Sequence, residues 1–262
     1  MQFSDSHCHL DFAEFKPDLQ QLLTQCSQQA IHRCVIPSIA PNNWQTVLNL
    51  VQQPDNPVQL FAALGIHPWF LNDLNNSHLN DLSSQVKQHK QHIIAIGEAG
   101  IDGKIAEQFN NFDKQMHFFE QQLILAQDEQ LPIIIHHRRS HQHIVPLLKQ
   151  HNVDKTGVIH AFSGSYQQAT QYIDLGYKLG VGGTITYPRA KKTINAIKRL
   201  PLTSLVLETD APAMPLAGYQ DQRNSPLQIT EIFKTLATIR TENEQQLAKQ
   251  LELNIEDLFN IK

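Results

Sequence analysis

The sequence predicts an α/β protein of the (β/α)8 class, a TIM barrel. Short apolar runs alternate with longer amphipathic segments about eight times along the chain. Several runs are continuous, as at 132–135 and 205–207, which is typical of parallel strands buried on both faces. The 262 residues match the ~250 of a typical barrel. Because no linker, low-complexity segment or charge block divides the chain, we expect one domain over residues 1–262.

Each expected strand is a short run rich in apolar or β-branched residues. These runs lie at 3–9, 33–37, 58–66, 93–98, 131–136, 158–160, 177–181 and 204–209. Helices are expected at 17–29, 42–53, 78–90, 107–129, 140–150, 166–175 and 188–200, and two further helical segments close the chain. A doubly wound open sheet is the alternative. No G-x-G-x-x-G follows the first strand, which disfavours the dinucleotide-binding form of that fold.

Composition narrows the class of protein. The formal net charge is −4, so nucleic acid would have to be held by a local patch, because the surface is not broadly cationic. Three cysteines without a C-x-x-C pair are typical of a reducing cytosol. The first residues carry no signal pattern, and the apolar runs are shorter than the ~20 residues of a membrane span. We therefore expect a soluble, cytoplasmic protein with no membrane partner.

Two histidines stand at the end of the first expected strand. Side chains alternate along a strand, so His7 and His9 project to one side and Cys8 to the other. In a barrel that side can be the interior, where both imidazoles can bind one metal ion. The alternative is a pair of ordinary structural histidines.

Acids and histidines also follow other strands directly. Barrels keep their catalytic groups at such strand ends, and a buried acid or imidazole without a partner is costly. This set, with His7 and His9, therefore predicts a metal centre: Glu98, His136, His160 and Asp210. Mixed imidazole and carboxylate donors suit zinc, manganese, nickel, cobalt or magnesium. Six such groups exceed the needs of one catalytic zinc and favour two divalent cations.

The motifs resemble, in order and spacing, those of the TatD family of metal-dependent deoxyribonucleases. They are H-x-H at 7–9, GEAGID at 97–102, H-x-R at 136–138, HAFSG at 160–164 and LETDAP at 207–212. The run LGVGGTITYP at 179–188 is most similar to the YjjV-type branch. The resemblance covers essentially the whole chain. It implies a TIM barrel of the amidohydrolase superfamily with two divalent metals.

The resemblance also implies how the ligands divide. His7, His9 and Asp210 would hold the first metal, His136 and His160 the second, and Glu98 would bridge the two. The chain departs from the family after the fourth strand, where it has Ala99, Ile101 and then Gly103-Lys104. His137 stands where a serine is usual. These departures put the fit of a substrate in question and leave the metal ligands intact.

Two acids are candidates for proton transfer. Asp210 is expected to orient or deprotonate the attacking water, because a carboxylate beside that water can accept its proton. Glu208 lies two residues earlier and shares a strand face with Asp210. It would act as a partner for a histidine ligand or as a second proton acceptor. The alternative is a buried structural acid.

Two further residues are candidate substrate contacts. His67, in Gly-Ile-His-Pro after the third strand, matches an element that in the resembled family looks like a phosphate contact; the alternative is a neutral loop histidine. Arg138 shares a face with His136 and would form a forked contact to phosphate, the alternative being a salt bridge within the barrel. Aromatic residues that follow strand ends are candidates for stacking on bases or for ordinary packing: Trp69, Phe70, Phe162, Tyr166 and Tyr187.

The leading prediction is a metal-dependent deoxyribonuclease that cleaves phosphodiester bonds with a metal-activated water. The first alternative keeps the metal centre but acts on a small phosphoester, amide or lactone, which the net negative charge favours. The second is a metal-binding protein without catalysis. DNA or another phosphoester is the expected partner, and no obligate protein partner is predicted.

Overall fold

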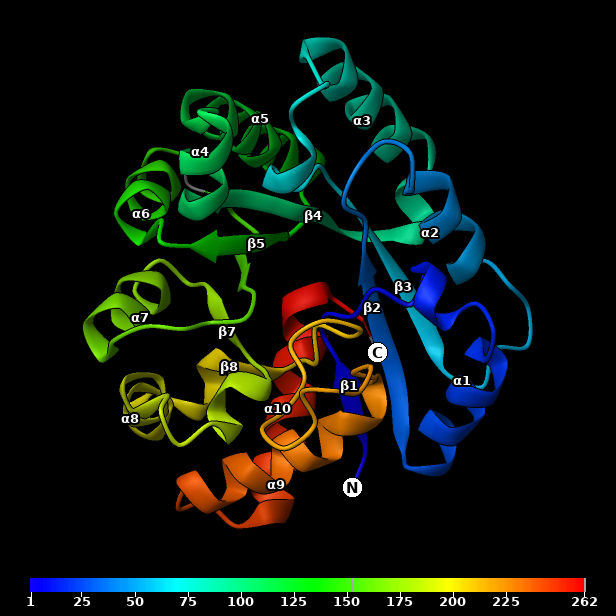
Figure 1. The fold of residues 1–262 in the computed structure, drawn as a ribbon, viewed down its shortest axis with the longest axis vertical. Coiled ribbons are helices and arrows are strands. Elements are labelled where there is room, and N and C mark those ends of the chain that lie inside the picture. The colour runs from blue at the N-terminus through cyan, green and yellow to red at the C-terminus, as the bar shows by residue number, and fades with distance from the viewer. Residues whose placement is uncertain (152, 262) are drawn as a thin grey trace.

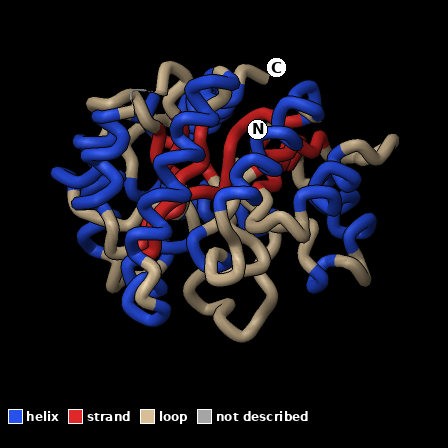
Figure 2. Tube along the Cα trace, turned by 90° about the horizontal axis from the view of Figure 1, so that it is seen from above, coloured by secondary structure: helices blue, strands red, loops and turns tan. Residues whose placement is uncertain are grey.

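The computed structural model describes residues 1–151 and 153–261, and its eight strands form one parallel sheet in chain order. The strands are β1 (Phe3–Asp5), β2 (Ile31–Pro37), β3 (Gln59–Leu64), β4 (Ile93–Asp102), β5 (Ile133–Arg138), β6 (Gly157–Ile159), β7 (Lys178–Val181) and β8 (Leu205–Leu207). Helices alternate with them and surround the sheet, as Figures 1 and 2 show. The predicted (β/α)8 barrel is confirmed.

The helices follow the expected order with one difference. They are α1 (Leu19–Gln28), α2 (Trp44–Val51), α3 (Asn76–Gln88), α4 (Gly103–Phe109), α5 (Phe112–Glu129), α6 (His141–Gln150), α7 (Tyr166–Ile173), α8 (Lys191–Arg199), α9 (Ile229–Ile239) and α10 (Glu244–Phe259). The single helix expected at 107–129 is two helices, because Asn110 adopts a left-handed conformation that ends α4. Strand β4 continues four residues past its expected end at Glu98, as far as Asp102.

The barrel closes through residues that lie just beyond β1 and β8. The Ser6 amide donates to the Leu207 carbonyl at 2.9 Å, and the Asp210 amide donates to the His7 carbonyl at 2.9 Å. The buried Asp5 carboxylate adds a link, accepting hydrogen bonds from the Thr209 amide and hydroxyl. The segments that close the barrel are therefore the ones that carry His7, His9 and Asp210.

The core has two layers. Apolar side chains on the outer faces of the strands pack against the surrounding helices in a large cluster. A smaller cluster joins residues of six strands, Val35 and Ile134 among them, to Ile255, Leu258 and Phe259 of α10. Helix α10 therefore packs against the inner strand residues at one end of the barrel, and it lies behind the strands in Figure 1. The opposite end is left for polar groups. Within the described residues, no helix has the length and apolar character to cross a membrane.

Candidate metal centre

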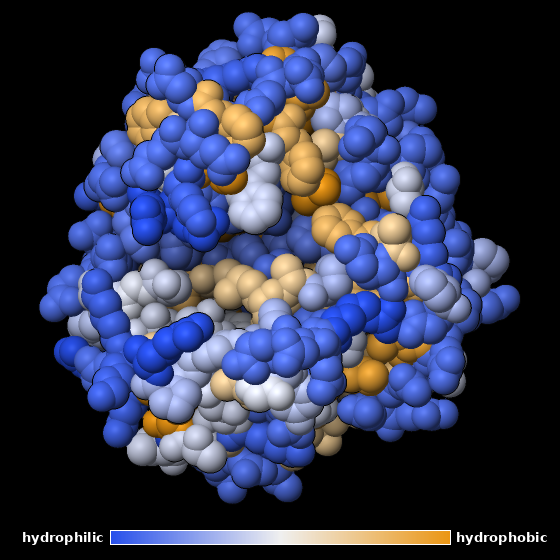
Figure 3. Space-filling model, viewed as in Figure 1, coloured by the Kyte–Doolittle hydropathy of each residue, from blue (hydrophilic) through white to orange (hydrophobic). Residues whose placement is uncertain are grey.

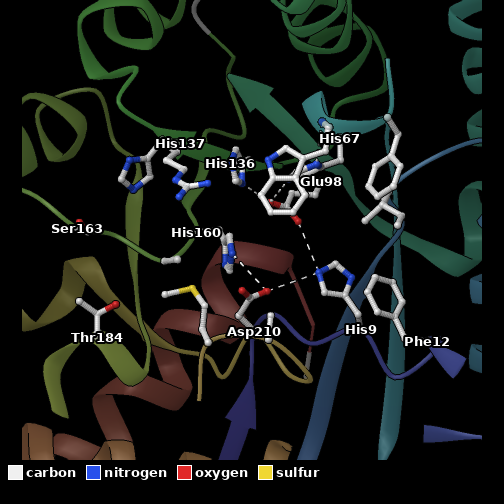
Figure 4. Close-up of a pocket in the computed structure, with 17 residues that line it drawn as sticks. His9, Phe12, His67, Glu98, His136, His137, His160, Ser163, Thr184 and Asp210 are labelled. Atoms are coloured by element: carbon white, nitrogen blue, oxygen red, sulfur yellow. Dashed lines mark hydrogen bonds and ion pairs between the residues drawn. The ribbon is translucent and has the colours of Figure 1, made fainter. Parts of the chain in front are cut away.

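The carboxyl ends of the strands surround a cavity of about 500 Å³. Figure 3 shows this hollow at the centre of one face, with hydrophobic side chains along parts of its margin. The candidate residues gather at its floor, and in Figure 4 the side chains of His9, Glu98, His136, His160 and Asp210 point toward a common space. All six predicted metal ligands are thus brought to one place from β4, β5 and the segments after β1, β6 and β8.

Glu98 lies at the middle of the cluster, with one carboxylate oxygen toward each side. Its Oε2 is 3.2 Å from His7 Nε2 and 3.7 Å from His9 Nε2. Its Oε1 is 3.0 Å from His136 Nδ1 and 3.4 Å from His67 Nε2. The carboxylate is 2% exposed, so water does not replace these contacts. Two separate imidazole pairs therefore face the two oxygens of one carboxylate.

Asp210 and His160 complete the cluster on the β8 side. Asp210 Oδ1 lies 3.6 Å from His9 Nε2 and 3.7 Å from His7 Nε2. His160 Nε2 is also 3.6 Å from this oxygen, and the His160 ring stacks on that of His7 with centroids 3.5 Å apart. The structure thus groups His160 with His7 and Asp210, whereas the family resemblance pairs it with His136.

The donor atoms fit a divalent cation. His7 Nε2 and His9 Nε2 approach to 3.2 Å. Two nitrogens held ~2.0–2.1 Å from one zinc ion at a tetrahedral angle would lie about 3.3 Å apart. Three overlapping groups of ligand atoms occur within 4.8 Å of one another: His7, His160 and Asp210; His7, His9 and Glu98; His67, Glu98 and His136. Imidazole and carboxylate donors without thiolate suit zinc, manganese, nickel, cobalt or magnesium.

The charges in the cluster also favour a cation. Burial by itself lowers the pKa of His160, but Glu208, Asp210 and Glu98 outweigh it and raise that pKa to about 10. Burial opposes ionisation of Glu98 as well, yet the surrounding imidazoles hold the pKa of this carboxyl well below its usual value. The imidazoles lower the pKa of Asp210 against burial in the same way, so Glu98 and Asp210 remain ionised and their field stabilises positive charge at the centre.

Two of the imidazoles have a hydrogen-bond acceptor behind the ring, and a third has a carboxylate at ion-pair distance. His9 Nδ1 lies 3.1 Å from the Pro37 carbonyl. His136 Nε2 lies 3.1 Å from Asp102 Oδ2, and His160 Nδ1 lies 3.1 Å from Glu208 Oε1. In the neutral form of such a ring the proton lies on the side of the carbonyl or carboxylate, so that a cation entering the cavity would meet the lone pair of the other nitrogen. This is the arrangement that orients a histidine ligand.

His67 has the opposite arrangement. The Trp69 backbone amide donates to His67 Nδ1 at 3.2 Å, so this nitrogen accepts. Burial lowers the pKa of His67 to about 4, despite the opposing charge of Glu98, and the ring is therefore neutral at pH 7. A neutral imidazole that accepts at Nδ1 carries its proton on Nε2. His67 thus presents an N–H donor to the cluster, although its Nε2 lies among the candidate metal-ligand atoms.

The supporting carboxylates are themselves held firmly. Asp102 is fully buried and accepts from the Trp69 indole N–H at 2.7 Å and from the first amides of α4. Glu208 is 1% exposed and accepts from the Ala161 amide at 2.5 Å. It does not line the cavity and instead lies behind His160. A Cβ at Gly180 would lie 2.1 Å from Glu208 Oε2, so this position accommodates only glycine while the carboxylate keeps its place.

Arg138 lines the cavity with a side chain that is 44% exposed. Its Nη1 lies 3.8 Å from Asp102 Oδ2, the outer limit of an ion pair. The guanidinium thus approaches a barrel carboxylate from the cavity wall, and its role as a phosphate contact stays a prediction. His137 lies beside it on the wall, with a buried Nε2 that has no partner among the described residues.

Sequence reasoning assigned no role to Asp102 and Asp5. Asp102 ends β4 and supports His136. The sequence feature that could have indicated this role is an acid at the end of the GEAGID motif. Asp5 lies on β1, where burial raises its pKa to about 7 despite hydrogen bonds from Thr209 and the His7 amide. An acid within an apolar strand was the signal there, because a buried acid requires partners.

Known proteins match almost the entire chain. Residues 4–260 match the family described as TatD related DNase. The chain is 41% identical to the uncharacterized metal-dependent hydrolase YjjV of Escherichia coli K12, over 99% of this chain and 98% of that protein. It is 40% identical to an uncharacterized metal-dependent hydrolase of Haemophilus influenzae, over 99% of this chain and 100% of that one.

A solved structure agrees with these matches. The crystal structure of the Escherichia coli TatD homologue YjjV has a TM-score of 0.93 to this chain, covering 99% of this chain and 98% of its own. The resemblance drawn from the H-x-H, GEAGID, HAFSG and LETDAP motifs is therefore confirmed. The chain belongs to the family of TatD related DNases and is a metal-dependent hydrolase.

Proposed function

We propose that the chain is a deoxyribonuclease that cleaves phosphodiester bonds at a centre of two divalent cations. The observation that carries the proposal is Glu98, whose two oxygens face different imidazole pairs beside a cavity that also holds Arg138. A pair of cations bridged by a carboxylate suits phosphodiester cleavage, because both the attacking and the leaving oxygen gain charge. The family description as DNases supports DNA as the substrate.

In this proposal, which follows the family resemblance, His7, His9 and Asp210 would hold one cation, His136 and His160 would hold the other, and Glu98 would bridge them. The proximity of His160 to Asp210, at 3.6 Å, supports a compact pair that shares neighbouring ligands. The donor set is compatible with zinc, magnesium, manganese, nickel or cobalt. When bound, such cations lower the pKa of water and polarise phosphoryl oxygens.

The chain's own residues then divide the remaining work. Asp210, whose side chain is 15% exposed, accepts the proton of the attacking water. His67 donates from Nε2 to a phosphoryl oxygen, and Arg138 contacts a second oxygen through its free guanidinium donors. Glu208 and Asp102 act as positioning residues for His160 and His136, since Glu208 lies behind the ring and away from the cavity.

A nuclease assay tests the proposal directly. Purified protein loaded with magnesium, manganese or zinc should cleave single- or double-stranded DNA, and both chelation and Glu98→Ala should abolish cleavage. Glu252→Ala is the matched control, because Glu252 is also largely buried but contacts Ser4 and His32, away from the centre. If metal-loaded protein leaves all DNA intact, the deoxyribonuclease proposal is wrong.

A second candidate function is hydrolysis of a small phosphoester, amide or lactone. The observations that favour it are the net charge of −4 and a cavity of about 500 Å³, a size typical of small-molecule sites. Turnover of a substrate panel that exceeds turnover of DNA would decide for it. A cytoplasmic location is also part of our proposal and is supported by three buried cysteines that form no disulfide.

A further inference from the structure

Aromatic side chains near the cavity differ in what covers them. Of those that follow strand ends, Trp69 and Phe70 are 46% and 43% exposed and line the cavity wall. The others are covered: Phe162 is 2% exposed, and guanidinium groups cover the rings of Tyr166 and Tyr187. Of these five aromatic side chains, Trp69 and Phe70 therefore remain open to a ligand.

The Trp69 ring is fixed in place at the mouth. Its indole N–H donates to Asp102 Oδ2 at 2.7 Å, and Asp102 is fully buried. Its backbone amide donates to His67 Nδ1, which ties the start of the turn Pro68–Phe70 to the cluster. A half-exposed aromatic ring whose polar atom is hydrogen-bonded in the interior is already held in place. The protein therefore loses little conformational entropy when a ligand contacts this ring.

The Trp69 ring lies beside His67 and beside His136, which is a proposed metal ligand. The centroid of Trp69 is 5.5 Å from that of His67 and 6.4 Å from that of His136. Phe70 lies 5.9 Å from His67 by the same measure. A group that contacts Trp69 or Phe70 would therefore lie next to a phosphate bound by His67. The base and the phosphate of one nucleotide are neighbours in this way.

We propose that Trp69, together with Phe70, stacks on the base of the nucleotide whose phosphate is cleaved. This inference rests on the proposed function. Because the indole N–H is already taken by Asp102, Trp69 can offer only its face, which accepts any base. The base must present a free face of its own, and a cavity of about 500 Å³ admits a nucleotide but not a stacked duplex. Trp69 is thus a substrate-positioning residue as well as a support for Asp102.

The test separates the ring face from the N–H. Cleavage of a short oligothymidylate is compared with cleavage of an abasic oligonucleotide of equal length. Wild type should prefer the oligothymidylate by about tenfold or more in KM, the range of base–aromatic stacking. Trp69→Ala should remove this preference and Trp69→Phe should keep most of it, although both lose the hydrogen bond to Asp102. If Trp69→Ala slows both substrates equally, Trp69 only supports Asp102 and the inference is wrong.

A matched pair checks Phe70. Phe70→Ala should reduce the preference for the oligothymidylate by about threefold or more, whereas Phe109→Ala should leave it unchanged. Phe109 on α4 is 44% exposed, as much as Phe70, but does not line the cavity. Equal effects of the two substitutions would show that general surface hydrophobicity, and not a stacking site, is responsible.

A binding measurement keeps the inference testable even without DNA cleavage. The chain has two tryptophans, and Trp44 is buried, so Trp44→Phe leaves Trp69 as the fluorescent probe at the mouth. Thymidine 5′-monophosphate should quench its emission, and 2-deoxyribose 5-phosphate, which lacks the base, should not. Absence of cleavage would refute the proposed function alone. Absence of quenching at thymidine 5′-monophosphate concentrations that saturate the protein in calorimetry would refute the stacking site.

Discussion

His9, His136 and His160 turn one ring nitrogen toward the cavity and the other toward an acceptor, whereas His67 turns its second nitrogen toward a donor. In the neutral rings, the carbonyl or carboxylate behind the first three favours the proton on its own side and leaves the other lone pair for a cation. The Trp69 amide behind His67 reverses the tautomer and places a proton toward the same space. The group that contacts the second ring nitrogen therefore decides whether a histidine of this cluster suits cation binding or hydrogen-bond donation.

A second difference separates the three ligand-like imidazoles. His9 rests against a neutral carbonyl, while His136 and His160 rest against the carboxylates of Asp102 and Glu208. A carboxylate partner makes an imidazole a stronger donor to a cation than a carbonyl does. Carboxylates thus support the imidazoles on the β5 and β6 side of the centre, and a backbone carbonyl supports His9 on the β1 side.

The largest effect is expected where both sides meet. Glu98→Gln keeps the shape of the side chain but removes the charge that faces His7 and His136. We expect kcat/KM to fall about 10³-fold or more, as for residues that act as one catalytic unit. Elemental analysis should show that bound metal falls from two equivalents toward one. Two equivalents retained with full activity would contradict a bridging role.

Because His67 presents a donor and the proposed ligands present acceptors, replacing His67 should lower activity without lowering metal binding. His67→Ala should lower kcat/KM about 10²-fold, because one donor to developing charge is lost, while metal content stays at the wild-type value. His9→Ala should lower both, since its Nε2 lies in the ligand group. Loss of metal in His67→Ala would show that His67 is a ligand and that the tautomer argument is wrong.

The carboxylate supports predict a graded loss of metal affinity. Asp102→Asn and Glu208→Gln should each weaken metal binding about 10- to 100-fold, because each removes the negative charge behind a ligand imidazole. Glu252→Gln provides the control, a partly buried carboxylate beside His32 and far from the centre. Titration of the apoprotein against a metal indicator measures all three. Equal affinities in all variants would remove the distinction between carboxylate-backed and carbonyl-backed imidazoles.

Sequence patterns predicted the cluster of candidate ligands and one of its supports, Glu208, but not the other, Asp102. His7, Glu98 and Asp210 were predictable because each is a polar residue directly after an apolar run, and such positions converge at one end of a barrel. The partner of His136, in contrast, comes from a neighbouring strand whose register the sequence does not reveal. Asp102 faces His136 only because β4 continues past Glu98, and the apolar pattern indicated that it ended there.

The aromatic residues show the same limit. Trp69, Phe162 and Tyr187 were equivalent in the sequence, since each follows a strand end. Their exposure depends on contacts between distant segments, such as Arg189 over Tyr187 and Asp102 beneath the Trp69 indole. The fold class was predictable because it needs only periodicity and length, whereas the choice among these rings requires the packed structure.

A glycine offers a subtler test of the carboxylate behind His160. Gly180→Ala would place a Cβ 2.1 Å from Glu208 Oε2, so the carboxylate must move and its contact with His160 must weaken. We expect a loss of metal affinity of about tenfold or less, together with about 1–3 kcal/mol of stability. Gly182→Ala is the control, because its Cβ would meet the Glu208 backbone oxygen at an ordinary 3.5 Å. Similar affinities in the two variants would indicate that Glu208 tolerates displacement.

The smallest effect concerns a carboxylate whose partner is a guanidinium and not an imidazole. The hydrogen bond from Arg240 lowers the pKa of Glu242 to about 2, against the effect of burial. A lowered pKa stabilises the fold at pH above the unfolded value of 4.5, and this stability is lost as the pH falls toward 2.

Urea unfolding of wild type and Glu242→Gln should therefore differ by about 1–2 kcal/mol at pH 6, allowing for solvent screening, and by less at pH 3.5. Metal binding should be identical in the two proteins, because Glu242 lies outside the cluster. A stability difference that does not change with pH would mean that this pair contributes packing and not charge. A difference that follows the predicted pH dependence would show that carboxylates remote from the centre affect folding alone, whereas Asp102 and Glu208 affect the metal.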